Sequence, residues 1–90
     1  MKKLSISHIL TQHRYECEDL LRRLQKGENF IQLAKQHSLC SSAAQGGYLG
    51  VVPLAKLDSD FAEACESLSP GKYSAPVRTR FGFHIILVHN

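Results

Sequence analysis

Residues 82–88 read Gly-Phe-His-Ile-Ile-Leu-Val, and this run decides how the rest of the sequence is interpreted. Successive side chains of a strand point to opposite faces, so a period of two places His84 on one face with Ile86 and Val88. The alternate positions are also large and apolar. A strand that is apolar on both faces is typical of the interior of a sheet. The run therefore predicts a final strand that is covered from both sides.

Residues 3–10, Lys-Leu-Ser-Ile-Ser-His-Ile-Leu, carry a second histidine in a strand-like pattern. His8 shares its parity with Leu4 and Ile6, so the imidazole is predicted on a buried face. A buried imidazole needs hydrogen-bond partners. If the first and last strands are neighbours, the simplest partner for each histidine is the other one. The alternative is that each is a core histidine whose hydrogen bonds are satisfied independently.

Composition limits the class of protein. The 90 residues, 43% of them hydrophobic, predict one compact domain over residues 1–90. Three widely spaced cysteines form no C-x-x-C pattern, which predicts free thiols and no metal site. The net charge of +3 is too small for dedicated nucleic-acid binding. No run approaches the roughly 20 apolar residues of a membrane span, and no apolar leader follows the first lysines. We therefore expect a cytoplasmic monomer without a cofactor or a membrane partner.

The sequence between the two histidine strands predicts three helices. A helical repeat of apolar residues covers residues 14–25, with acidic residues early and basic residues late, and Gly27 follows as a stop. Asn29 is expected to cap a second helix that ends near residues 37–38. Residues 58–60 offer a cap for a third helix, whose apolar stripe is Phe61, Ala64, Cys65 and Leu68.

The remaining segments predict a loop, a turn and further strands. Residues 38–50 are small and polar, which favours a functional loop, and a short extended piece follows at residues 51–53. Residues 69–72, Ser-Pro-Gly-Lys, suit a type II turn. Residues 73–79 are expected to form a strand that Pro76 confines to the edge of a sheet. The element order is β-α-α-β-α-β-β, which indicates an α+β domain with an antiparallel sheet.

Several stretches together resemble the parvulin-type peptidyl-prolyl cis/trans isomerases, and they cover nearly the whole chain. The matching stretches are residues 8–10, residues 34–42 (Ala-Lys-Gln-His-Ser-Leu-Cys-Ser-Ser), residues 46–50 (Gly-Gly-Tyr-Leu-Gly), Phe61, and residues 76–86 with their Phe-Gly-Phe-His-Ile-Ile ending. The resemblance implies the parvulin (FKBP-like) fold, a four-stranded antiparallel sheet with about three to four surrounding helices. It also implies isomerisation of Xaa-Pro bonds in proline-containing, unfolded or partly folded polypeptides, which would assist folding.

The resemblance also implies site residues. The catalytic polar network would consist of His8, Cys40, Thr79 and His84. The apolar pocket for the substrate proline would consist of Leu49, Leu57, Phe61 and Phe81. Leu57 stands where the family more often has methionine, and this swap of similar volume should keep the pocket.

Two departures from the family pattern bear on specificity. Tyr48 stands where the resemblance implies an aspartate, so a carboxylate near the cleft is missing, and the sequence leaves open whether Tyr48 contacts substrate or covers the loop instead. Residues 11–14, Thr-Gln-His-Arg, lack the basic cluster of phosphate-directed members. Specificity for phosphoserine or phosphothreonine is therefore not expected, since a dianion is usually held by several charge-assisted contacts.

Two other functions remain open on the sequence. A proline-directed chaperone or binding module would use the same cleft with little catalysis. A Cys-His hydrolase would need Cys40 activated as a nucleophile, but Cys40 follows a predicted helix end, and no oxyanion-donor motif is evident. The hydrolase therefore ranks below the other two.

Overall fold

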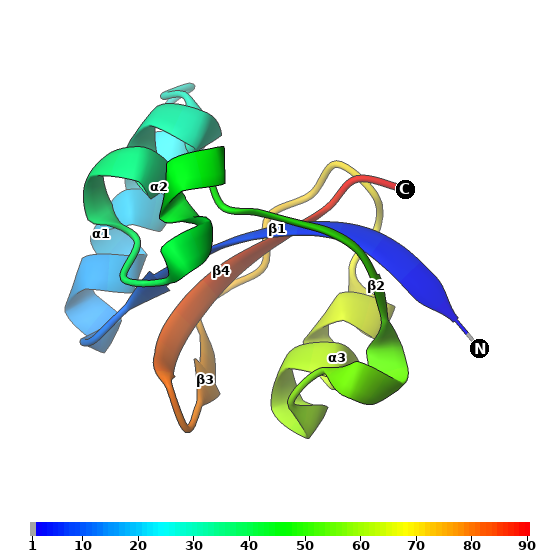
Figure 1. Cartoon of the computed structure of the whole chain (residues 1–90). Coiled ribbons are helices and arrows are strands. Elements are labelled where there is room, and N and C mark those ends of the chain that lie inside the picture. The colour runs from blue at the N-terminus through cyan, green and yellow to red at the C-terminus, as the bar shows by residue number, and fades with distance from the viewer. Residues whose placement is uncertain (1) are drawn as a thin grey trace.

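A four-stranded antiparallel sheet forms the centre of the computed structural model, which describes residues 2–90 (Figure 1). The strands are β1 (Lys3–Thr11), β2 (Tyr48–Pro53), β3 (Val77–Thr79) and β4 (Gly82–Val88), in the order β2-β1-β4-β3. The first and last strands are therefore neighbours, which is the condition under which the two histidines can be partners. Their register runs from Ile6 opposite Val88 to Thr11 opposite Phe83.

Three α-helices cover the sheet from both sides, which confirms the predicted α+β class. Helices α1 (Arg14–Gln25) and α2 (Phe30–His37) lie on one face, and α3 (Ser59–Ser67) lies on the other (Figure 1). The helix bounds agree with the sequence patterns. Asn29 Oδ1 accepts a hydrogen bond from the Gln32 N–H at the start of α2, and Asp58 Oδ1 accepts one from the Asp60 N–H at the start of α3.

The core consists of two clusters, one on each face of the sheet. Under α1 and α2, Ile9 and Ile85 are fully buried together with Cys17. On the α3 face, Ile6 and Ile86 are buried with Cys65. The two central strands thus contribute side chains to both clusters, and β4, which is covered on both faces, is apolar at nearly every position. Within residues 2–90, no helix is both long enough and apolar enough to cross a bilayer.

The segment predicted as a loop has more structure than expected. A short 3-10 helix, η1, spans Ser41–Gln45, and β2 already begins at Tyr48 rather than near residue 51. Gly46 and Gly47 both have positive φ, at 68° and 86°, so they reverse the chain between the two elements. The His8 N–H donates to the Gly47 carbonyl over 2.9 Å, which holds this turn against β1. Small residues and glycines give no periodic signal, so the sequence could not reveal either element.

The strand predicted over residues 73–79 is shorter than expected. Only Val77–Thr79 forms β3, while Tyr73 makes an isolated bridge to Leu87. Pro76 has no N–H to donate to the ladder, so regular pairing begins after it. The predicted edge position is confirmed, because β3 pairs with β4 alone. A second short 3-10 helix, η2 (Leu54–Lys56), joins β2 to α3.

Candidate functional site

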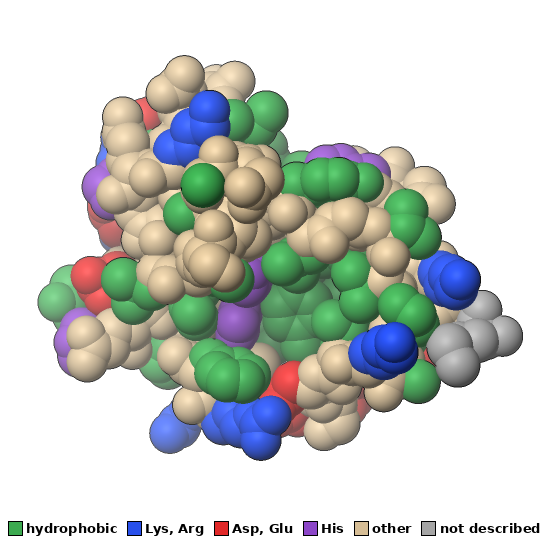
Figure 2. All heavy atoms as spheres, in the orientation of Figure 1, with side chains coloured by type: hydrophobic (Ala, Val, Ile, Leu, Met, Phe, Trp, Pro, Cys, Tyr) green, Lys and Arg blue, Asp and Glu red, His purple; other side chains and the backbone are tan. Residues whose placement is uncertain are grey.

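A cleft of about 360 Å³ opens on the α3 face of the sheet and brings together every residue of the two predicted site groups. Its lining includes His8, Cys40, Leu49, Leu57, Phe61, Thr79, Phe81 and His84. These residues come from β1, β2, β3, β4, α3 and the loops between them. Figure 2 shows the hollow with histidine atoms inside it and hydrophobic side chains around it.

The two histidines are hydrogen-bonded to each other below this cleft. In the β1–β4 register His8 lies opposite Ile86 and His84 lies opposite Leu10, so the imidazoles are diagonal neighbours on one face. Their Nδ1 atoms are 2.9 Å apart, and the rings are stacked at 5.1 Å with an interplanar angle of 17°. Only 5% of His8 and 3% of His84 is exposed. Each imidazole therefore finds the partner that the strand pattern suggested.

Thr79 continues the hydrogen-bonded chain. Its Oγ1 lies 2.7 Å from His84 Nε2 and accepts a hydrogen bond from the Phe81 N–H over 3.1 Å. The hydroxyl has one hydrogen to donate, and His84 Nε2 is its only acceptor among the described residues. Thr79 therefore donates to Nε2, which places the hydrogen of the neutral His84 ring on Nδ1. That hydrogen is donated to His8 Nδ1, and the hydrogen of His8 then lies on Nε2.

His8 Nε2 is the free end of this chain. It is buried and has no hydrogen-bond partner among residues 2–90. Since Nδ1 of the same ring faces His84, Nε2 points away from the histidine pair. A buried N–H without a partner is costly, so it is a ready donor for a polar group that enters the cleft.

Both imidazoles are neutral at pH 7. Burial lowers the pKa of His8 to about 4, helped by the proximity of His84. Burial also lowers the pKa of His84 to about 4, although the Asp58 carboxylate acts in the opposite direction. The cleft therefore offers hydrogen bonds from neutral groups and no imidazolium charge.

Apolar side chains form the wall around the polar floor. The Phe61 ring packs edge-on against both imidazoles, with centroid distances of 5.5 Å to His8 and 5.1 Å to His84. Leu49 and Leu57 are partly buried and pack against the same cluster as Phe61. Phe81 is 60% exposed, so its ring forms one side of the mouth and is available for contact with a ligand.

Cys40 lies at the cleft but outside the hydrogen-bonded chain. The Leu39 N–H donates to the Leu10 carbonyl, and Ser38 Oγ accepts from the Leu10 N–H, so the segment before Cys40 is attached to the end of β1. Among the described residues, its thiol has no hydrogen bond to either imidazole. It directly precedes η1, a helix start that the sequence pattern missed, but this helix is only 5 residues long.

The other two cysteines pack in the core clusters, Cys17 under α1 and α2 and Cys65 on the α3 face. All three cysteines are free thiols, and Cys17 and Cys65 are buried. Burial raises the pKa of each of these two thiols to about 11. Within residues 2–90, no group of three or more His, Cys, Asp or Glu side chains is arranged to hold a metal ion.

Tyr48 does not line the cleft that its neighbour Leu49 lines. Its hydroxyl lies 3.1 Å from Ser5 Oγ, and its ring packs edge-on against His89 at 5.7 Å. These neighbours line a separate hollow with Phe30 of α2, on the opposite side of the sheet.

The sequence interpretation also missed four residues that line the cleft, namely Leu10, Lys56, Asp58 and Arg80. Leu10 shares the parity of His8, and that signal was available. The three charged residues are sequence neighbours of the predicted pocket residues Leu57 and Phe81. Adjacency alone does not say whether a charged side chain turns toward a pocket, so this signal was weak.

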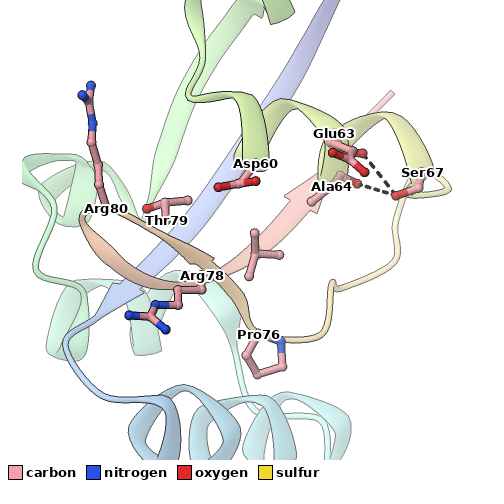
Figure 3. A pocket seen from close by; sticks show the side chains of 9 residues that line it. Asp60, Glu63, Ala64, Ser67, Pro76, Arg78, Thr79 and Arg80 are labelled. Carbon is pink, nitrogen blue, oxygen red and sulfur yellow. Dashed lines mark hydrogen bonds between the residues drawn. The ribbon is translucent and has the colours of Figure 1, made fainter.

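A more open groove of about 710 Å³ adjoins the cleft at Thr79 and Arg80 (Figure 3). It lies between α3 and β3. Asp60 and Glu63 line its helix side, and Arg78 lines its strand side. Among the predicted site residues only Thr79 borders this groove, so the groove extends the site without containing its polar floor.

Comparison with known proteins identifies the family. Residues 7–90 match the family described as "Rotamase: PPIC-type PPIASE domain". The chain is 41% identical over 85 residues to the foldase protein PrsA of Bacillus subtilis, covering 93% of this chain and 29% of that protein. It is 36% identical over 91 residues to the parvulin-like PPIase of Rickettsia conorii, covering 97% of this chain and 32% of that protein. The chain thus spans about a third or less of these relatives.

Solved structures agree with this assignment. The crystal structure of PrsA from Bacillus subtilis matches with a TM-score of 0.94 at 39% identity, over 98% of this chain and 35% of that one. The solution structure of NmPin, the parvulin of Nitrosopumilus maritimus, matches with a TM-score of 0.88 at 34% identity, over 100% of this chain and 98% of that one. With its cleft, its histidine pair and these relatives, the chain belongs to the PPIC-type PPIase, or parvulin, family.

Proposed function

We propose that this chain is a peptidyl-prolyl cis/trans isomerase that acts on Xaa-Pro bonds of unfolded or partly folded polypeptides. The observation that carries the proposal is the cleft itself, an apolar pocket above a neutral chain of hydrogen-bonded side chains. Membership of the family supports it. Assistance to protein folding is part of the proposal, and the foldase name of the Bacillus subtilis relative supports that part.

The reaction needs no bond to be broken. Rotation about a peptide bond must cross about 18 to 20 kcal/mol because resonance keeps the amide planar. The proposed cleft would hold the proline ring among Leu49, Leu57, Phe61 and Phe81 and exclude water from the amide. Removal of water and contacts that favour the twisted amide would lower the barrier relative to both planar isomers.

The histidines would act as fixed hydrogen-bonding groups in this mechanism. Because both have pKa values of about 4, neither carries a proton that it could donate as an imidazolium at pH 7. We propose that the N–H at His8 Nε2 meets a carbonyl oxygen of the substrate, and that Thr79 and His84 keep this hydrogen in place. A preorganised donor of this kind costs no reorientation during the rotation.

Cys40 would contribute through its position and its dipole. The thiol has no hydrogen bond to a histidine base among the described residues, which supports a non-covalent role over the Cys-His hydrolase. We expect Cys40→Ser to keep measurable isomerase activity. Complete loss with an intact fold would instead favour a step that depends on the thiolate.

The direct test is two-dimensional exchange NMR on a panel of Xaa-Pro peptides, with the protein at a small fraction of the peptide concentration. Uncatalysed exchange takes roughly tens to hundreds of seconds, so acceleration is easily seen. Faster cis/trans exchange would support the isomerase. Peptide shifts without faster exchange would support the proline-directed binding module, because equal binding of ground and transition states leaves the barrier unchanged.

A matched pair of variants separates pocket contacts from general packing. Leu57 and Leu68 are both partly buried and pack against the same core cluster, but only Leu57 lines the cleft. We expect Leu57→Ala to lower kcat/KM for every Xaa-Pro peptide by about tenfold, as expected for about 1–2 kcal/mol of lost apolar contact. Leu68→Ala should cost stability with little change in kcat/KM. Equal effects of both variants on activity would contradict the proposed pocket.

A further inference from the structure

The mouth of the cleft carries charges that the isomerase mechanism does not use. Lys56, Asp58 and Arg80 line the cleft together with the apolar wall. Lys and Arg side chains, drawn in blue, lie along the lower rim of the hollow in Figure 2. Two cations and one carboxylate at the mouth give a local excess of positive charge. The exposure and ion pairing of each group decide which of these charges an incoming peptide can contact.

Arg80 is held at the mouth and remains open to solvent. Its guanidinium carbon lies 4.9 Å from the centroid of the Phe81 ring, a cation-π contact that fixes the group beside the pocket wall. Its side chain is 78% exposed. A guanidinium that is fixed but solvated keeps its hydrogen-bond donors available for a carboxylate.

Asp58 offsets this positive charge only in part. Its Oδ2 lies 4.0 Å from Arg80 Nε, at the limit of an ion pair, and its side chain is 21% exposed. Its Oδ1 already accepts the Asp60 N–H at the start of α3. The carboxylate therefore faces the helix N-terminus, which is itself electropositive. Lys56 is exposed and has no ion pair within residues 2–90, so it adds to the positive side.

We propose that this cleft prefers prolines flanked by an acidic side chain, and that Arg80 is the specificity-determining residue, assisted by Lys56. The proposal rests on the proposed isomerase function and names its substrate class. Consecutive Cα atoms are about 3.8 Å apart, so with the proline against Phe81 only a residue adjacent to the proline places its carboxylate beside the guanidinium. The ligand at this subsite is a single aspartate or glutamate carboxylate.

The adjoining groove limits the preference to that adjacent residue. Beyond Arg80 the groove presents Asp60 and Glu63 on α3 opposite Arg78 on β3 (Figure 3). Among the described residues, neither carboxylate is paired with a cation. An acidic side chain further along the peptide would meet both positive and negative charges, so it would add little binding energy. Moving a glutamate away from the proline should therefore remove its advantage.

The size of the preference follows from the exposure of the charges. An exposed ion pair changes an equilibrium by about two- to fivefold, so we expect kcat/KM for a Glu-flanked proline to exceed that for the Gln analogue by this factor. Screening lengths fall to about 3 Å at 1 M salt. The preference should therefore nearly vanish there, while exchange of the Gln peptide persists.

The experiment is exchange NMR on peptides with Glu, Gln or Lys directly before or directly after the proline, and with Glu moved three residues away. We expect a Glu advantage on at least one side of the proline at low salt. Arg80→Gln should remove this advantage, and Arg80→Glu should reverse it in favour of Lys. Arg78→Glu is the matched control, because it makes the same charge change two residues earlier in the sequence, on β3, at a side chain that does not line the cleft and points in a different direction in Figure 3.

Each outcome decides between distinct conclusions. Equal rates for Glu and Gln peptides, or an advantage that survives in both Arg80 variants, would overturn the charge preference while leaving the isomerase proposal intact. Loss of the advantage in Arg78→Glu as well would show a diffuse charge effect and overturn the role of Arg80. If no peptide exchanges faster, the isomerase proposal fails, and affinities from the same peptide titrations still test the charge preference.

Discussion

Replacing Thr79 with valine tests the hydrogen-bonded chain beneath the cleft. Valine keeps the shape of threonine and removes the hydroxyl, so His84 Nε2 loses its partner at 2.7 Å. Because His84 is only 3% exposed, water cannot readily take the place of that hydroxyl. A buried polar group left without a partner costs about 1–3 kcal/mol. We therefore expect Thr79→Val to lower the free energy of unfolding by this amount.

The assay is urea unfolding at pH 7 together with a thermal melt, in which about 1 kcal/mol corresponds to a Tm shift of roughly 4–8 °C for a domain of this size. Thr79→Ser should recover most of the loss, since it restores the hydroxyl. Thr11→Val is a matched control, because Thr11 is also buried but its hydroxyl donates to the carbonyl oxygens of His13 and Phe83.

A second measurement addresses the direction of the hydrogen bonds that link Thr79, His84 and His8. Nitrogen chemical shifts of the imidazole rings distinguish protonated from unprotonated ring nitrogens. In the unaltered protein we expect the hydrogen on Nε2 of His8 and on Nδ1 of His84. Thr79→Val should weaken this preference, and Thr11→Val should not. A hydrogen on Nδ1 of His8 in the unaltered protein, or a stability loss below about 0.5 kcal/mol in Thr79→Val, would refute the reasoning.

Three further predictions address the same site. Stability should fall as the pH drops from about 6.5 toward 4, because an unfolded histidine binds a proton near pH 6.5 whereas the folded His8 and His84 bind one only near pH 4. At pH 5 the expected loss is about 2 kcal/mol or less for each of the two histidines. Urea unfolding at pH 6.5 and at pH 5 measures this fall in the free energy of unfolding. If His84→Gln lost as much stability between the two pH values as the unaltered protein, the low pKa of His84 would be contradicted. Gly47→Ala should destabilise by about 2 kcal/mol or more, because φ is +86° and a Cβ would lie 2.3 Å from the His8 carbonyl oxygen. Gly50→Ala is the control, because φ is +88° there but a Cβ would meet open space. In the same thermal melts it should lose only the stability that corresponds to backbone strain. A small thiol reagent should alkylate Cys40 in the folded protein, while the buried Cys17 and Cys65 are protected. Mass spectrometry of the labelled protein measures this, and equal labelling of all three cysteines would contradict the packing.

The sequence predicted most of what depends on regular spacing. The parity of His8 and His84 gave their common face, and the apolar repeat over residues 14–25 gave α1 with its observed bounds. Asn29 and Asp58 marked helix starts because a capping side chain acts over only two or three residues. These features are local, so a single sequence contains them.

Features that depend on chain reversals were harder to predict. The face occupied by Tyr48 depends on two successive positive-φ glycines, and no alternating pattern passes through them. Likewise, the position of Arg80 beside Phe81 and Asp58 depends on how the β3–β4 turn meets the start of α3. Such meetings between distant segments are set by tertiary packing, which the spacing of residues does not encode directly.

The central pairing of β1 with β4 has a consequence for how the protein is made. The two hydrogen-bonded histidines are 76 positions apart, so nearly the entire chain separates the halves of the polar floor. During synthesis, β1 leaves the ribosome before β4, and the edge of β1 that pairs with β4 has no partner until residues 82–88 follow. Helices α1 and α2 have local contacts and can form earlier, whereas closing so long a loop is slow. A translation product that stops before β4 would lack His84 and the strand that holds β1 and β3 together, so the polar floor of the cleft forms only once β4 has been made.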